Sequence, residues 1–180
     1  MHLAIVGNIG SGKTTLTGLL SNHYNCEALY ESVENNPYLE DFYLDMKRWS
    51  FNLQIFFLNS RFQQVRQINH TNSLIIQDRT IYEDCYIFAD NLGLMTTRDY
   101  ENYYSIFQSV IHFVRPPDLL IYLQASVPTL VSNIQRRGRE YETGIRLDYL
   151  SKLNDKYENW IKNYQEGKLL VINKDKINFA

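Results

Sequence analysis

Short apolar segments alternate with longer segments of helical periodicity along the whole chain. Each short segment is almost continuously apolar, as expected for a parallel strand that helices cover on both faces. The predicted strands are Leu3–Val6, Ala28–Tyr30, Leu74–Gln77, Leu119–Leu123 and Leu169–Ile172. Strands and helices that alternate in this way are typical of an α/β fold, so the pattern predicts a five-stranded parallel sheet flanked by helices on both faces.

The segments between the strands have the spacing of amphipathic helices. The predicted helices are Lys13–Tyr24, Trp49–His70, Ile81–Ala89, Tyr100–Phe113, Val127–Arg137 and Leu147–Tyr164. The helix Trp49–His70 is apolar on more than one side, which predicts packing on the sheet and on something else, with a second subunit as one candidate. Thr80 precedes the third helix and Glu83 follows three residues later, which matches a capping box.

The composition excludes several classes of protein. A length of 180 residues suits one domain with one core, and a net charge of −2 without a long basic run argues against a dedicated nucleic-acid binder. No segment approaches the ~20 apolar residues of a membrane span, and the N-terminal apolar stretch is too short for a signal peptide. Because Cys26 and Cys85 form neither a metal pattern nor a disulfide framework, we expect a cytoplasmic protein.

A phosphate-binding loop follows the first predicted strand. The residues Gly7-Asn8-Ile9-Gly10-Ser11-Gly12-Lys13-Thr14 match G-x-x-x-x-G-K-[ST] and lead into a predicted helix. Glycines let backbone N–H groups surround a phosphate, and the helix adds its positive end. We expect Lys13 to reach the outer phosphates of a nucleotide and Thr14 to offer its hydroxyl to Mg²⁺.

Charged residues end two other predicted strands, at the carboxyl edge where α/β proteins bind ligands. Asp78 follows the third strand and is expected to help hold the metal, and its neighbour Arg79 can contact a substrate oxygen or the transferring phosphate. Glu31 ends the second strand, where a carboxylate can take a proton from an attacking hydroxyl. A surface glutamate with no chemical role is the alternative.

Two helices carry residues that suit a flat ligand. Gln54 and Arg61 lie seven residues apart on nearly one helix face, ~10.5 Å along the axis, and Asp84 and Phe88 lie four apart on the next helix. A nucleobase fits this set, because the ring can stack on the base while the polar groups read its edge. A buried Arg61–Asp84 ion pair that serves only structure is an equal alternative. The cluster Arg136-Arg137-Gly138-Arg139 is either a solvated patch or a lid over phosphates.

In this order the residues resemble the deoxynucleoside kinase family, most closely its bacterial deoxyadenosine kinase-like branch. The resemblance covers nearly the whole chain, and it rests on Gly7–Thr15, Glu31-Ser32-Val33, Asn36-Pro37-Tyr38-Leu39, Arg48-Trp49-Ser50-Phe51 with Gln54 and Arg61, Asp78-Arg79-Thr80 with Asp84, and Arg137-Gly138-Arg139 with Glu142. It implies a P-loop kinase fold and a single kinase domain over residues 1–180, with an arginine lid at about 136–142. ATP is then the phosphoryl donor, with Mg²⁺, and the acceptor is the 5′-hydroxyl of a deoxynucleoside in nucleotide salvage.

The resemblance also implies roles around the sugar. Glu31 is the general base on the 5′-hydroxyl, Arg79 binds near that hydroxyl and the moving phosphoryl group, and Asp78 assists the metal. Tyr43 and Glu142 hold the 3′-hydroxyl. The family is typically dimeric through long helices, which fits the helix with two apolar sides.

Further roles concern the base and the lid. The resemblance assigns base reading to Gln54, Arg61 and Asp84, and stacking on the base to Phe88. Arg137 and Arg139 form the lid on the donor phosphates. An ionised Asp84 only accepts hydrogen bonds, so it favours the exocyclic amine of adenine or cytosine over a carbonyl. Deoxyadenosine is therefore the expected substrate, with deoxycytidine plausible, and the choice of adenine over cytosine comes from the resemblance alone.

Two other functions are compatible with a phosphate loop. A nucleoside monophosphate kinase shares the fold, but Glu31 and Asp84 would repel an acceptor that carries phosphate. A P-loop switch or assembly ATPase needs a water-positioning residue and a responsive surface, and the sequence assigns neither. We expect small-molecule ligands, a homodimer, and no nucleic-acid or membrane partner.

Overall fold

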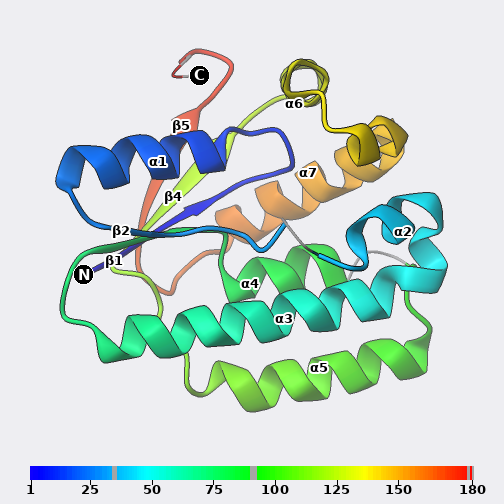
Figure 1. Ribbon diagram of the computed structural model, residues 1–180, viewed down its shortest axis with the longest axis horizontal. Coiled ribbons are helices and arrows are strands. Elements are labelled where there is room, and N and C mark those ends of the chain that lie inside the picture. The colour runs from blue at the N-terminus through cyan, green and yellow to red at the C-terminus, as the bar shows by residue number, and fades with distance from the viewer. Residues whose placement is uncertain (34–35, 90–92, 178, 180) are drawn as a thin grey trace.

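A computed structural model describes residues 1–33, 36–89, 93–177 and 179 of the chain (Figure 1). Within these residues, parallel strands form one five-stranded sheet in the order β2-β3-β1-β4-β5. The strands are β1 (His2–Val6), β2 (Glu27–Leu29), β3 (Ile75–Asp78), β4 (Leu119–Gln124) and β5 (Lys168–Asn173). Every predicted strand is present, and each end lies within one residue of its predicted position, so the predicted fold class is confirmed.

Helices lie on both faces of the sheet, which explains why the central strands β1 and β4 are largely apolar (Figure 1). In β1, Leu3 and Ile5 pack in the cluster that Leu16 and Leu20 of α1 also join. The alternate residues of β1 face the opposite side, in a cluster with residues of α2, α3 and α7. Both positions of the strand's two-residue period are therefore buried.

The helical elements follow the sequence pattern with two additions. They are α1 (Lys13–Tyr24), α2 (Leu39–Leu44), α3 (Met46–His70), α4 (Ile81–Glu83), the π-helix η1 (Asp84–Ala89), α5 (Thr97–Ile111), α6 (Val127–Arg137), the 3₁₀ helix η2 (Glu140–Gly144) and α7 (Leu147–Lys162). The short α2 and η2 were not predicted. The helix predicted over Ile81–Ala89 is present, but it is α-helical only to Glu83 and continues as a π-helix to Ala89.

The long helix α3 packs on two layers. On one side Leu53 belongs to the cluster beneath the sheet, and on the other Leu58 packs with Tyr103 and Phe107 of α5. Figure 1 shows α5 beside α3, on the side away from the sheet. The second apolar side of α3 is thus covered within the chain and gives no evidence of a second subunit. No helix in the described residues has both the length and the apolar composition needed to cross a membrane.

Candidate active site

The phosphate loop connects β1 to α1 at the carboxyl edge of the sheet. Gly10 and Gly12 have φ angles of 83° and 92°, which other residues rarely adopt. A Cβ atom on Gly10 would also lie 2.7 Å from the carbonyl oxygen of Leu130, so the loop packs closely against α6. The Nζ atom of Lys13 donates to the carbonyl oxygen of Asn8 at 3.1 Å. Burial, and then the nearby Arg79, lowers the pKa of Lys13 to about 8.

Two oxygen-bearing side chains meet beside this loop. Ile5 of β1 pairs with Asp78 of β3, and this register brings Asp78 to the start of α1. The hydroxyl of Thr14 donates to Asp78 Oδ2 at 2.6 Å, and Asp78 Oδ1 is buried without a hydrogen-bond partner among the described residues. Hard oxygen donors of this kind fit Mg²⁺, which usually takes one or two protein ligands and completes its shell with phosphates and water.

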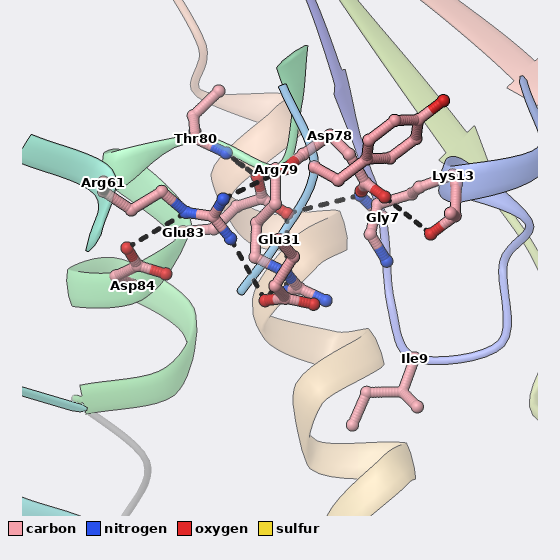
Figure 2. A network of polar contacts seen from close by, with 12 residues as sticks. Gly7, Ile9, Lys13, Glu31, Arg61, Asp78, Arg79, Thr80, Glu83 and Asp84 are labelled. Carbon is pink, nitrogen blue, oxygen red and sulfur yellow. Dashed lines mark hydrogen bonds and ion pairs between the residues drawn. The ribbon is translucent and has the colours of Figure 1, made fainter. Parts of the chain in front are cut away.

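The carboxylate of Glu31 is held by two arginines, as Figure 2 shows. Arg79 Nε lies 2.7 Å and Arg61 Nη2 lies 3.1 Å from the same oxygen, Glu31 Oε1. Burial raises the pKa of Glu31, but Arg79 and Arg61 outweigh this effect, so the pKa lies below its ordinary value. The site therefore holds an ionised carboxylate at neutral pH, as a proton acceptor requires.

Arg61 connects three parts of the site. Besides Glu31, its Nη1 donates to the carbonyl oxygen of Asp78 at 3.1 Å, and its Nε lies 3.4 Å from Asp84 Oδ2. The predicted Arg61–Asp84 ion pair is thus present, and both side chains are buried. Burial raises the pKa of Asp84 to about 7, although Arg61 opposes this shift. The expectation of a fully ionised Asp84 therefore needs correction for the unliganded protein near neutral pH.

A cavity of about 460 Å³ opens between these groups, which is large enough for a small organic ligand. Most predicted site residues line it: Ile9, Gly10, Lys13, Thr14, Glu31, Tyr43, Gln54, Asp78, Arg79, Asp84, Phe88, Arg137, Arg139 and Glu142. Arg61 is not among the lining residues, because it lies behind Glu31 and Asp84. Gln54 is 3% exposed, and its Oε1 has no hydrogen-bond partner in the described part of the chain. An unsatisfied buried amide beside a cavity indicates a polar ligand.

The comparisons with known proteins agree with this geometry. The family model described as deoxynucleoside kinase matches residues 3–180. The chain belongs to the deoxynucleoside kinase family. The predicted resemblance is confirmed, and the chain is a kinase that phosphorylates deoxynucleosides with ATP as the donor. Neither the monophosphate kinase nor the switch ATPase is favoured.

Individual relatives in this family are similar over most of their length. The chain is 39% identical over 175 residues to a deoxyadenosine/deoxycytidine kinase of Bacillus subtilis (strain 168), which covers 94% of this chain and 81% of the relative. It is 44% identical over 165 residues to a deoxyadenosine kinase of Dictyostelium discoideum, covering 90% of this chain and 67% of that protein. The solved structure of deoxyadenosine kinase from M. mycoides with bound dATP has a TM-score of 0.87 and 34% identity, and covers 97% of this chain and 91% of that one.

Two arginines at the end of α6 and just after it share one acidic partner, Glu142. Arg137 donates through Nε to Glu142 Oε2 at 3.0 Å and through Nη2 to Glu142 Oε1. Arg139 Nη1 lies 3.5 Å from the latter oxygen. The helix α6, which leads into this segment, is held to the phosphate loop, because Asn133 Nδ2 donates to the carbonyl oxygen of Gly10 at 2.8 Å. The arginine segment therefore lies at the phosphate side of the cavity.

Two side chains close to Arg79 were missed as parts of the site. The predicted capping box is present, since the backbone N–H of Thr80 donates to Glu83 Oε2 at 2.7 Å. The other oxygen, Glu83 Oε1, accepts from the hydroxyl of Tyr157 at 2.6 Å. Tyr157 occupies an ordinary apolar position of α7, in line with Leu150, Leu153 and Ile161. For Tyr157, the only feature of the sequence that could have indicated a role in the site was its hydroxyl on an otherwise apolar helix face.

Proposed function

We propose that this kinase phosphorylates the 5′-hydroxyl of deoxyadenosine, with deoxycytidine as a second substrate, using ATP and Mg²⁺ in nucleotide salvage. The observation that carries the proposal is the Glu31 carboxylate, held by Arg79 and Arg61 at the junction of the phosphate loop and the cavity. A hydroxyl acceptor needs such a base, whereas a phosphate acceptor would be repelled by it. The similarity to the B. subtilis deoxyadenosine/deoxycytidine kinase supports the same substrates.

The acceptor chemistry assigned to the chain is proton transfer with charge stabilisation. Glu31 accepts the 5′-hydroxyl proton as the oxygen attacks the terminal phosphorus of ATP, while the bond from that phosphorus to the bridging oxygen breaks and ADP leaves. Arg79 orients Glu31 and faces the moving phosphoryl group, and Lys13 carries positive charge to the outer phosphates. Tyr43 and Glu142 both line the cavity, and we assign the sugar 3′-hydroxyl to them.

The donor side holds the metal and closes over the phosphates. Thr14 and Asp78 are the residues that would hold Mg²⁺, and when bound the ion neutralises phosphate charge. The backbone of residues 7–15 binds the phosphates. We assign the segment at about 136–142, with Arg137 and Arg139, as a lid on one domain that spans the chain.

The base is assigned to the opposite end of the cavity. Gln54 and Asp84 offer an amide and a carboxylate to its edge, and Phe88 offers its ring. The guanidinium of Arg79 lies 4.4 Å from the centre of the Phe88 ring. We assign Arg61 to the orientation of Asp84, and we do not propose the expected contact with a ring nitrogen, because Arg61 does not line the cavity. An exocyclic amine donates to the carboxylate, so adenine and cytosine are preferred to bases with a carbonyl there.

A homodimer and a cytoplasmic location complete the proposal. Tyr104 and Ile106 on α5 are each 40% exposed and Phe113 just beyond it is 64% exposed, which supports a second copy packed on this helix. Cys26 and Cys85 are both free cysteines, and we propose a reducing compartment for them. Light scattering of wild type and Ile106→Glu tests the dimer, and an unchanged oligomeric state in the variant contradicts this interface.

A phosphotransfer panel tests the proposed function. Deoxynucleosides, ribonucleosides and nucleoside monophosphates are each offered with ATP, in the presence of Mg²⁺ and of a chelator. We expect transfer to deoxyadenosine to be fastest, to deoxycytidine slower and to thymidine poor, and we expect no transfer without Mg²⁺. Faster transfer to a monophosphate, or a preference for thymidine, would show that the assignment of the acceptor pocket is wrong.

A further inference from the structure

The side chain of Arg79 is held from several directions although its backbone is unusual. The residue has a φ angle of 71°, which is uncommon outside glycine, and it is 3% exposed. Its Nε lies 2.7 Å from Glu31, and its Nη1 donates to the Tyr157 hydroxyl at 2.9 Å. Phe88 covers one face of the guanidinium. A strained, buried arginine with this many contacts is typical of a functional site.

A second carboxylate lies close to the same guanidinium. Glu83 is completely buried, and its Oε1 lies 3.7 Å from Arg79 Nη1. Figure 2 shows Glu83, Arg79 and Thr80 close together. The backbone N–H of Gly7, at the start of the phosphate loop, also points to this oxygen at 3.4 Å. Arg79 therefore has two possible carboxylate partners, Glu31 on the substrate side and Glu83 on the protein side.

The hydroxyl of Tyr157 lies between Arg79 and the second of these carboxylates, Glu83. It donates to Glu83 Oε1 at 2.6 Å and accepts from Arg79 Nη1, so it bridges the two side chains. Burial raises the pKa of Tyr157 well above its ordinary value, so the hydroxyl keeps the proton that it donates. A buried carboxylate that lost this donor would gain from a direct bond to the nearest cation, which is Arg79.

We propose that Tyr157 is a positioning residue, whose hydroxyl satisfies Glu83 and thereby keeps Arg79 on Glu31. The inference rests on the proposed function, in which Glu31 is the general base. Without the hydroxyl, Arg79 turns toward Glu83 and leaves Glu31 with weaker support. A structural role alone, in which Tyr157 and Glu83 only stabilise the core and the helix cap, predicts a loss of stability with no change in the chemistry.

The experiment compares two tyrosine variants, Tyr157→Phe and Tyr122→Phe. Tyr122 is a matched control, because it is equally buried, stacks on Tyr157 at 6.0 Å and also donates to a glutamate, Glu158, at 2.9 Å. For Tyr157→Phe we expect kcat to fall about 10-fold to 100-fold while KM for the deoxynucleoside changes little. For Tyr122→Phe we expect wild-type kcat, with any effect confined to Tm.

The pH profile of kcat provides a readout that a structural role does not move. The charged groups that lower the pKa of Glu31 are Arg79, Arg61, Lys13 and Arg137, with Arg79 the strongest. When Arg79 turns away, the pKa of Glu31 rises, so the acid limb of the Tyr157→Phe profile moves to higher pH. Arg79 and Glu83 also act on the pKa of Asp84, so the comparison is repeated in an Asp84→Asn background, where Asp84 cannot contribute to the acid limb.

A double variant tests the competition directly. Glu83→Gln removes the charge that attracts Arg79 but keeps an oxygen acceptor for the cap. In Tyr157→Phe/Glu83→Gln we therefore expect kcat and the acid limb to return toward those of Glu83→Gln alone.

Two outcomes would overturn the proposal. One is a wild-type kcat and acid limb in Tyr157→Phe, and the other is a double variant with no recovery. All variants are assayed with the best deoxynucleoside of the wild-type enzyme, so an error in the assigned base does not affect the outcome, and an inactive wild type contradicts the proposed function instead.

Discussion

Arginine–carboxylate pairs occur in two regions of this enzyme, and the arginines are buried in one region and about one-third exposed in the other. In the acceptor pocket the side chains of Arg61 and Arg79 are 1% and 4% exposed, whereas Arg137 and Arg139 near the phosphates are 34% and 36% exposed. A buried pair is rigid, and the loss of one partner leaves an uncompensated charge. Arg137 and Arg139 are about one-third exposed, so solvent partly screens their charges and they exchange partners more easily, although their shared partner Glu142 is itself buried.

The difference indicates a division of labour between the two regions. The acceptor pocket holds Glu31 in place before any substrate arrives, because each of its polar partners is already fixed. We propose that the arginines on Glu142 exchange this carboxylate for phosphate oxygens when the nucleotide binds. We therefore expect substitutions in the pocket to change chemistry and specificity strongly, and substitutions in the lid to act weakly.

The largest effect is expected from Glu31→Gln in the buried pocket. The amide keeps the shape of the side chain but cannot accept the hydroxyl proton, so we expect kcat to fall ~10²–10⁴-fold while deoxynucleoside binding is retained. Steady-state kinetics and calorimetric binding check this. An unchanged kcat with weaker binding would make Glu31 a positioning residue, and the buried pocket would then not differ in chemical role from the exposed arginine segment.

Lys13→Ala is expected to nearly abolish transfer, by about 10²–10³-fold, because the loop loses its charge on the outer phosphates. Burial and Arg79 lower the pKa of Lys13 from 10.5 to about 8, so at neutral pH the folded protein carries a charge that its surroundings disfavour. Removing that charge should therefore not lower Tm. Thermal unfolding of the unliganded variant checks this, and near-normal turnover in a folded variant contradicts the phosphate-loop assignment.

Asp84→Ala tests the specificity of the pocket. Arg61 loses one carboxylate and the exocyclic amine loses its acceptor, so we expect weaker deoxyadenosine binding and a loss of about 10-fold to 100-fold in discrimination against bases with a carbonyl. The measurement is kcat/KM for the four deoxynucleosides with wild type and variant. If the variant keeps the wild-type ranking, Asp84 serves structure only.

The same carboxylate predicts a pH effect of about tenfold or less. Because burial raises the pKa of Asp84 to about 7, against the pull of Arg61, the group is mostly protonated at about pH 6 and mostly ionised at about pH 8. Only the ionised form is a pure acceptor, so the kcat/KM ratio of deoxyadenosine to thymidine should rise with pH. In Asp84→Asn, which cannot titrate, the ratio should stay constant, and a parallel rise there assigns the effect to another group.

The smallest effect is expected in the exposed region. Arg139→Ala should lower kcat/KM for ATP no more than about tenfold and leave Tm unchanged, since solvent already screens this charge and Arg137 remains. Arg146→Ala is the control, because Arg146 is 72% exposed, pairs with Asp148 at 2.9 Å and does not line the cavity. A loss in Arg139→Ala as large as that of Glu31→Gln would show that the two regions do not differ as we infer.

Local sequence patterns were sufficient for the framework of the molecule. Largely apolar runs identify all five strands of the described sheet. Burial on both faces explains the run in β1, whereas in the edge strand β5 Leu170 and Val171 are each 46% exposed. The glycines that precede Lys13 identify the phosphate loop, since residues other than glycine rarely adopt the positive φ angles found at Gly10 and Gly12. Motif order along the chain was enough to indicate the family that the comparisons show.

Only the tertiary structure decided how the charges are shared. The sequence left two alternatives open: Glu31 as a surface residue with no chemical role, and an Arg61–Asp84 pair that serves only structure. Helical spacing shows which residues share a helix face, but it does not show which residues of other elements that face contacts. Arg61 proves to bind Glu31, Asp84 and the Asp78 carbonyl at once, from positions on separate elements. The hydroxyl of Tyr157 meets Glu83 across 74 residues of chain, and no local pattern encodes that contact. Partners and pKa shifts in this site depend on the packing of α7 and α3 against the sheet, which is a property of the whole fold.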